Sequence, residues 1–266
     1  MRCTPQEHSP HARQLPIPEA DDRLRMLLIR GAFGFMSALA VCLASPFPSF
    51  RSKRRIGQAQ EGQSEVILIR GAALSIFPYW PGAQDLADQL ETRGFAPTII
   101  NHYEYPRVAD EIARAIRRGR LTGGVSLVGY SFGSDAAGLL AERLDKRGVR
   151  VDTMALIEST WGTPVPGNVD HCVNFYKSRA LDFLPSSRGV PVVARSSQTT
   201  LTNINVGQYV SLADIAQHSH FTIGDNHRLH RLVGDFLESR RTPEMADAPA
   251  IAMTSLPSSG AVRPAA

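Results

Sequence analysis

The sequence has little of what marks several specialised classes of protein. Its three cysteines, Cys3, Cys42 and Cys172, lie far apart, which excludes a disulfide framework and gives no metal-ligand spacing. Basic residues are not interleaved with aromatic residues in the way that nucleic-acid binding requires, so no nucleic-acid partner is expected. The formal net charge is only +4 in 266 residues. Hydrophobic residues make up 43%, enough to bury the core of one large α/β domain.

A long apolar run suited to a membrane span is also missing. Residues 32–50 carry no charge, but Pro46 and Pro48 shorten the apolar run below the roughly 20 residues that a span needs. Arginines precede this run and small residues follow its apolar core, which is typical of an export signal. We therefore expect residues 26–50 to direct export to the periplasm or the medium. A membrane anchor is the alternative, and the basic residues at 51–55 oppose translocation.

The ends of the chain have the composition of unfolded segments. Residues 1–25 are polar and contain four prolines, and residues 241–266 are rich in Pro, Ala and Ser without periodicity. Both segments are expected to be disordered. With residues 51–64 expected to form a linker, the folded domain is predicted to span residues 65–240.

Within this domain, apolar runs alternate with helical patterns. Strands are predicted at 65–71, 96–101, 124–129, 151–157, 170–176, 190–194 and 201–206, and helices at 83–93, 106–118, 134–147 and 226–239. Residues 74–81 are expected to form a loop. Strands that alternate with helices predict a mostly parallel sheet with helices on both faces, a three-layer sandwich. In such a sheet the reactive groups lie beyond the carboxyl ends of the strands.

The most informative stretch is the motif Gly129-Tyr130-Ser131-Phe132-Gly133, which joins a predicted strand to a predicted helix. A serine on this sharp turn adopts a strained backbone, and side chains at the two glycine positions would collide with the strand and the helix. The turn presents the Ser131 hydroxyl at the end of the sheet. It also directs the Phe132 amide from the start of a helix, where developing negative charge is stabilised.

With its flanking strand and helix, this motif resembles the nucleophile elbow of the α/β-hydrolase fold. The resemblance extends from about Val66 to Leu237, and more narrowly the chain is similar to small bacterial lipase-like and thioesterase-like serine hydrolases without a large lid domain. The resemblance implies a triad of serine, histidine and an acid that needs no metal or cofactor. It does not determine the substrate.

A serine hydroxyl needs a base to become a nucleophile, and the resemblance places that base in the loop before the last helix. Of four late histidines, His227 and His230 have helical spacing and are expected at the surface. His220 is followed by apolar residues, as the histidine of the family is, and is the predicted base. His218 is the alternative.

The acid that orients the histidine should follow a strand after the elbow. Glu158 ends the predicted strand 151–157, where such relatives carry an acid, and is the predicted third member of the triad. A glutamate departs from the commoner aspartate and has a longer reach. Asp170 and Asp182 are the alternatives, and Asp182 follows the next strand, the acid position in many α/β hydrolases.

The oxyanion hole needs two amides, and the Phe132 amide is one of them. Ala72 or Ala73, in the segment after the first predicted strand, is expected to supply the other. Arg70 is expected to pair with Asp85 or to hold an anionic substrate group. Four aromatic residues are candidates for lining an acyl pocket, with core or lid packing as the alternative for each: Phe77, Tyr79, Trp80 and Tyr130.

The sequence therefore predicts a serine hydrolase that cleaves an ester or thioester of a lipid-like or small acyl substrate. An acyltransferase would use the same triad, and a non-catalytic binding protein would share the fold without the reaction. Membrane association through residues 26–50 accompanies the anchor alternative. Ser131, His220 and Glu158 are the residues on which the enzymatic interpretation depends.

Overall fold

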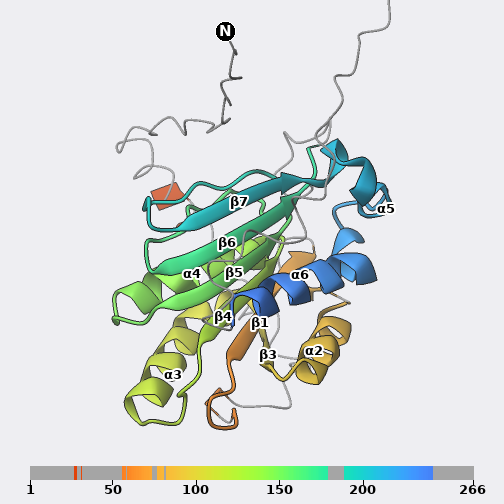
Figure 1. Cartoon of the computed structure of the whole chain (residues 1–266). Helices are drawn as coiled ribbons and strands as arrows, with labels where there is room; N and C mark the ends of the chain where they lie inside the picture. The colour runs from red at the N-terminus through yellow and green to blue at the C-terminus, as the bar shows by residue number, and fades with distance from the viewer. Residues whose placement is uncertain are drawn as a thin grey trace, which may run out of the picture.

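A computed structural model describes residues 27, 28, 31, 56, 57, 59–73, 77–80, 82–178 and 189–241. These residues form a central sheet covered by helices (Figure 1). The strands are β1 (Glu65–Ala73), β2 (Phe77–Tyr79), β3 (Ala96–Asn101), β4 (Val125–Tyr130), β5 (Val151–Ile157), β6 (Val169–Tyr176) and β7 (Thr200–Asn205). The helices are α2 (Ala83–Thr92), α3 (Tyr105–Arg117), α4 (Phe132–Asp145), α5 (Ala213–Ala216) and α6 (His227–Ser239).

Six of the strands in this part of the chain are parallel and lie in the order β3-β1-β4-β5-β6-β7. The short β2 instead pairs antiparallel with the last residues of β1. The carboxyl ends of parallel strands lie at one edge of a sheet, so the segments that follow β4 and β5 are neighbours. The predicted α/β class, with a mostly parallel sheet, is confirmed.

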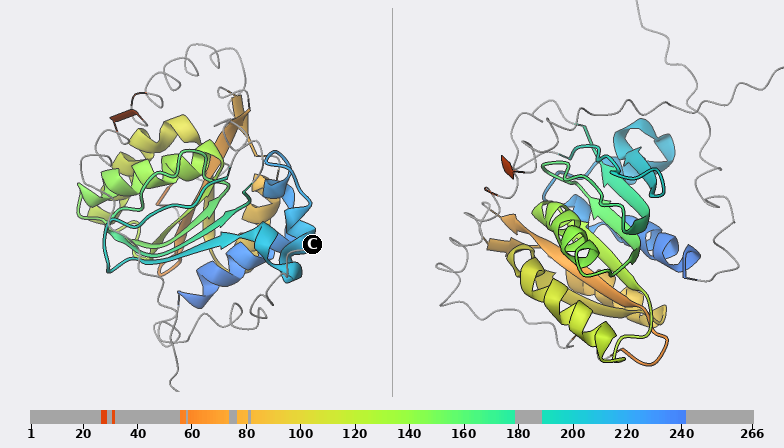
Figure 2. Two further views of the ribbon diagram at one scale, coloured as in Figure 1. Left: turned by 90° about the horizontal axis from the view of Figure 1, so that it is seen from above. Right: turned by 90° about the vertical axis from the view of Figure 1, so that its left-hand side faces the viewer.

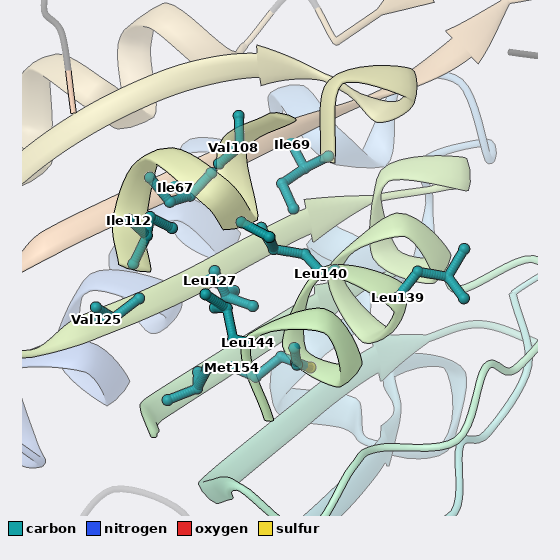
Figure 3. Close-up of a cluster of buried hydrophobic side chains, with 14 of the residues drawn as sticks. Ile67, Ile69, Val108, Ile112, Val125, Leu127, Leu139, Leu140, Leu144 and Met154 are labelled. Atoms are coloured by element: carbon teal, nitrogen blue, oxygen red, sulfur yellow. The ribbon is translucent and has the colours of Figure 1, made fainter. Parts of the chain in front are cut away.

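The helices form two layers, one on each face of the sheet (Figure 2). Helices α3 and α4 cover one face, and α2 and α6 cover the other. Side chains alternate along a strand, so Ile67 and Ile69 of β1 pack toward α3 and α4, whereas Val66 and Leu68 pack toward α2 and α6. Figure 3 shows the first of these two cores, where apolar side chains of the sheet meet those of α3 and α4. Burial on both faces explains why β1 is a continuous apolar run.

The segment predicted as a loop after β1 is in part a strand. β1 continues to Ala73, and Ala72 and Ala73 pair with Pro78 and Phe77 of β2. A proline is tolerated there because β2 lies at an edge of the sheet and is not required to donate on both sides. Residues 71–79 carry no hairpin signal, and pairing with the partner strand decides that β2 forms.

The strand predicted at 190–194 does not form a ladder; only one isolated bridge joins Val165 to Ala194. Side chains of the neighbouring strands take the place of a ladder. Asn203 on β7 accepts a hydrogen bond from the Val192 amide at 3.0 Å and donates to the Val192 carbonyl at 2.9 Å. Pro191 has no amide to donate. The β-branched composition of this segment therefore misled the strand prediction.

The described part of the predicted linker, 51–64, belongs to the domain. Ile56 is buried in the core against α3, and the Gly57 amide donates to the Glu65 carboxylate at 3.3 Å. The Gly62 amide donates to Thr122 Oγ1 at 3.1 Å. The folded unit therefore begins before residue 65, because the segment is held by contacts with residues distant in the sequence.

The predicted disordered ends, 1–25 and 241–266, lie outside the described residues apart from Arg241. So does the predicted export segment 26–50, apart from Leu27, Leu28 and Gly31. Among the helices of the described residues, none combines the length and the apolar character that a membrane span requires. Export and anchoring therefore stay predictions.

Truncation of Ile56 tests whether this segment is part of the folded unit. Ile56→Ala should lower the free energy of unfolding by about 2–3 kcal/mol, because a buried isoleucine loses its packing and leaves a cavity. Urea unfolding measures the change. Ile116→Ala, at a position on α3 that is 37% exposed, is the control and should have a much smaller effect. An Ile56→Ala chain as stable as the original would mean that residues 51–64 are a linker after all.

Candidate active site

The turn between β4 and α4 is sterically crowded, as the motif predicted. Ser131 has φ 55° and ψ −125°, a conformation that non-glycine residues rarely adopt. A Cβ at Gly129 would lie 2.4 Å from the Gly133 carbonyl oxygen, and a Cβ at Gly133 would lie 2.0 Å from the Ile69 carbonyl oxygen. Only glycine fits at either position. The turn thereby holds Ser131 at the carboxyl end of β4 and at the start of α4.

Ser131, His220 and Glu158 form a continuous chain of contacts. Ser131 Oγ lies 2.9 Å from His220 Nε2, and His220 Nδ1 lies 3.0 Å from Glu158 Oε2. Glu158 is fully buried, and His220 and Ser131 are 3% and 5% exposed. The three predicted triad residues, which are separated by up to 89 positions, are thus brought together in the geometry of a nucleophile, a base and an orienting acid.

Glu158, like Ser131, has a positive φ without being glycine, at 56°. Its backbone leaves β5 in this turn, and each oxygen of its carboxylate has a partner. Oε2 faces His220, and Oε1 accepts a hydrogen bond from the Lys177 amide at 2.7 Å. Gly189 packs against the same carboxylate, because a Cβ there would lie 2.6 Å from Oε1. The acid is therefore fixed from three sides.

The loop that carries His220 is anchored by residues of the α2 and α6 face. The Tyr130 hydroxyl donates to the His220 carbonyl. Trp80 Nε1 donates to the Gly224 carbonyl at 2.7 Å, and His230 Nε2 lies 2.7 Å from the same oxygen. These bonds hold the loop backbone at His220 and four residues after it.

This arrangement changes the expected role of several aromatic residues. Trp80 and Tyr130, predicted to line an acyl pocket, are 4% and 1% exposed and support the histidine loop instead. Tyr79 also bonds to the loop, through the Phe221 carbonyl at 3.0 Å, but is only partly buried. The side chain of Phe77 lies outside the described part of the chain. The pocket prediction failed for the two buried rings because sequence does not show which way they face.

The alternative candidates lie elsewhere. His218 Nδ1 faces Thr222 within its own loop at 3.3 Å, and Asp170 pairs with Arg150 at the amino end of the sheet, opposite the serine. Asp182 lies outside the described residues. His227 is exposed as expected, but His230 is completely buried, which corrects its predicted surface position. Its helical spacing placed it on α6 without showing which face turns inward.

The predicted oxyanion amides lie on two elements that meet at the elbow. Phe132 begins α4, and Gly71 of β1 lies directly against the turn, since a Cβ there would be 2.9 Å from Ser131 Cβ and 3.5 Å from the Phe132 nitrogen. Ala72 and Ala73 follow within β1 rather than in a loop. The choice of Ala72 or Ala73 as the second amide stays a prediction.

His102 is a buried residue beside this region that the sequence did not point out. Its ring lies 6.3 Å from the Phe132 ring and close to the Gly71 backbone. Burial lowers the pKa of His102 to about 4, against the weaker opposing effect of the Gly71 backbone. His102 is therefore a neutral, buried side chain beside the glycine that packs against the elbow.

Arg70, the residue before that glycine, does not meet Asp85 in the way predicted. Its Nη2 donates to Asn101 Oδ1 at 2.6 Å, and Asn101 Nδ2 in turn donates to the Tyr103 hydroxyl at 2.9 Å. Burial lowers the pKa of the Arg70 guanidinium, and nearby Glu104 opposes that change. The Arg70 guanidinium thus bonds to the neighbouring strand β3.

The strand order, the strained serine between β4 and α4, and the histidine loop before the last helix decide the architecture. The fold is that of the α/β hydrolases. This confirms the fold that the resemblance implied from about Val66 to Leu237.

Searches of protein-family models and of curated proteins found no match. Among solved structures, the chain is similar to an alpha-beta serine hydrolase homologue from Coxiella burnetii (14% identity, 70% of this chain and 88% of that chain, TM-score 0.37). A Pyrobaculum calidifontis esterase matches with 12% identity over 84% of this chain and 99% of that chain, with a TM-score of 0.42. A thioesterase from the prodiginine biosynthetic pathway in Streptomyces coelicolor matches with 11% identity over 74% and 93%, with a TM-score of 0.38.

Gly189 offers a test of how closely the acid is held. Gly189→Ala should lower kcat at least about tenfold, because the new methyl group displaces a carboxylate that cannot move without losing His220 or Lys177. Steady-state kinetics on a p-nitrophenyl ester measures the loss. Gly207→Ala is the matched control, since a Cβ there makes only ordinary contacts, the nearest at 3.4 Å. Equal kcat values for the two variants would contradict the tight fit around Glu158.

The lowered pKa of His102 predicts a pH dependence of stability. A histidine in the unfolded chain titrates near about 6.5, so between that pH and about 4 the unfolded chain binds more protons than the folded chain. The stabilisation is complete above the higher value and is lost as the pH falls toward the lower one. The expected contribution is up to about 3 kcal/mol.

Urea unfolding between about pH 7 and pH 4 measures this contribution as the difference between the original chain and His102→Gln. The variant should lose less stability on acidification than the original chain does. His227→Gln, at an exposed position, is the control and should follow the original curve. Parallel curves for the original chain and His102→Gln would show that His102 titrates normally.

Proposed function

We propose that this chain is a serine hydrolase that cleaves an ester or thioester bond of a lipid-like or small acyl substrate. The observation that carries the proposal is the buried chain from Ser131 Oγ through the His220 imidazole to the Glu158 carboxylate, with contacts of 2.9 and 3.0 Å. An arrangement of this kind makes a serine hydroxyl nucleophilic.

Each residue would have one role in the acylation step. Ser131 Oγ attacks the substrate carbonyl carbon while His220 Nε2 takes the hydroxyl proton. Glu158 holds His220 through Nδ1 and stabilises the imidazolium that forms. The negative charge on the carbonyl oxygen is stabilised by the Phe132 amide at the start of α4, with a second amide from Ala72 or Ala73.

The leaving group then departs as an alcohol or thiol, protonated by His220, and an acyl group remains on Ser131. A water molecule, which gives a proton to His220, attacks the acyl carbon; the bond to Ser131 Oγ then breaks, His220 returns the proton to Oγ, and the carboxylic acid is released. Both steps use only side chains, amides and water. An alcohol or amine in place of water would make the same site an acyltransferase.

Apolar groups beside the base support an acyl substrate. Phe221 directly follows His220 and is 45% exposed, and its ring packs edge-on against Tyr79 with 6.3 Å between the centroids. An exposed aromatic ring next to the reacting atoms is a suitable contact for an acyl chain. A panel of substrates of graded length would determine which acyl-chain length is preferred.

The test combines labelling with turnover. A fluorophosphonate should label Ser131, and p-nitrophenyl esters and acyl-thioesters of graded chain length should be hydrolysed. Ser131→Ala should abolish labelling and reduce turnover at least about 10³-fold, because the attacking oxygen is removed. Glu158→Gln should cost up to about 10⁴-fold, since the geometry is kept and the charge is lost.

The histidines provide matched variants for the same assay. His220→Ala should be as inactive as Ser131→Ala, with the double variant little worse, because the residues act as a unit. His218→Ala, two positions away, should stay close to the original rate. A folded chain that is neither labelled nor active would instead be a binding protein on this fold.

A further inference from the structure

A second buried carboxylate lies near the triad and takes no part in the reaction described above. Asp135 is in the first turn of α4, four residues after Ser131, and is completely buried. A buried aspartate is costly unless hydrogen bonds replace its hydration. The hydrogen-bond donors around Asp135 therefore indicate its structural role.

Five donor groups surround the Asp135 carboxylate, and all of them come from the segment that follows β5. Two are hydroxyls, Ser159 Oγ at 3.0 Å and Thr163 Oγ1 at 2.9 Å. Three are backbone amides, those of Thr160 at 3.0 Å, Trp161 at 3.1 Å and Thr163 at 3.2 Å. The carboxylate thus accepts from nearly every residue of the loop 159–163.

Burial raises the pKa of the Asp135 carboxyl, and the hydrogen bonds from Thr163, Trp161 and Thr160 oppose that rise. The amide donors cannot accept a hydrogen bond, so they favour an acceptor at this position. A carboxylate provides two oxygens that only accept. An amide at the same place would direct its NH₂ group at N–H or O–H donors.

The loop that Asp135 holds begins at the triad acid. Ser159 directly follows Glu158 in the sequence. Glu158 has the strained φ of 56° that directs its side chain toward His220. In the same loop, Thr160 Oγ1 lies 3.4 Å from Ser131 Oγ. The loop therefore touches two of the three members of the triad.

The neighbouring residue of α4 fixes the end of β5 in a similar way. Ser134 Oγ lies 2.9 Å from the Ile157 carbonyl oxygen and accepts from the Ile157 amide at 3.1 Å. Since Ser134 and Asp135 are on the same helical turn as the elbow, one rigid element carries the nucleophile and holds the strand end and loop of the acid.

We propose that Asp135 is a positioning residue of the triad. It holds loop 159–163 so that Glu158 keeps its strained backbone and its contact with His220, and so that Thr160 stays beside the nucleophile. The proposal rests on the proposed hydrolase function, but the contact that it concerns can be observed without turnover.

Asp135→Asn is the decisive variant, because it keeps the shape and removes one acceptor. Replacing Oδ2 by NH₂ loses the bond from the Thr160 amide, and replacing Oδ1 loses those from Ser159 and Thr163. We expect kcat to fall about 10²-fold with KM changed little, the scale of a displaced catalytic group. The far-downfield proton resonance of the His220 imidazole, which reports its bond to Glu158, should weaken or disappear.

Asp152→Asn is the matched control. Asp152 is a partly buried carboxylate on β5, the strand that leads to Glu158, but it lies at the amino end of that strand, away from the triad. Any loss of stability there should leave kcat per labelled serine and the downfield resonance unchanged. If Asp135→Asn does not fold, the double variant Ser159→Ala with Thr163→Val is measured in its place. It removes two donors, keeps Asp135, and should lower kcat by less than the expected loss for Asp135→Asn.

The outcomes separate the two proposals. An Asp135→Asn chain with the original kcat per labelled serine and an intact resonance would overturn the positioning role, even if its unfolding temperature fell. If Asp135→Asn is unfolded, a double variant with unchanged kcat and resonance would overturn it equally. A wild-type chain that shows the resonance but no labelling would contradict the hydrolase function while leaving the positioning contact in place.

Discussion

Ser131 and Glu158 occupy the carboxyl ends of the neighbouring strands β4 and β5 with positive φ angles of 55° and 56°. Each such position costs on the order of 1–3 kcal/mol for a residue other than glycine and persists only where the surroundings determine it. The site depends on these two strained turns, because a relaxed backbone at either position would direct the side chain away from His220.

The two turns are maintained by different means, and helix α4 contributes to both. The turn at Ser131 is maintained by close packing. Gly129 and Gly133 let helix α4, the turn and β1 approach each other where no side chain fits. The turn at Glu158 is maintained by hydrogen bonds. The Lys177 amide donates to the Glu158 carboxylate, and Asp135 accepts from the loop that follows Glu158. The base is supported separately, from the α2 and α6 face of the sheet, by Trp80, Tyr130 and His230. The triad therefore joins both layers of the domain.

The parts of the site that could be predicted are those whose signals are local. The elbow motif gives the crowding, the strand, the helix and the nucleophile within about a dozen consecutive residues. Chain order and the family resemblance then favoured Glu158 as the acid and His220 as the base, with Asp170, Asp182 and His218 left as alternatives. The roles of Trp80 and Tyr130 were not predictable, because the sequence shows that a ring is apolar but not which backbone oxygen its polar atom reaches. The buried face of α6, and with it His230, was missed for a related reason.

The sequence by itself determined the parallel α/β architecture and the sharp turn that carries Ser131, because both arise from patterns repeated or concentrated over short stretches. Only the tertiary structure decided that Ile56 belongs to the core and that residues 190–194 bond to Asn203 instead of forming a ladder. The same holds for the hydrogen bonds between Asp135 and the loop that follows Glu158. Each of these is a contact between residues far apart in the chain. Their free energy comes from partners that local propensity does not encode.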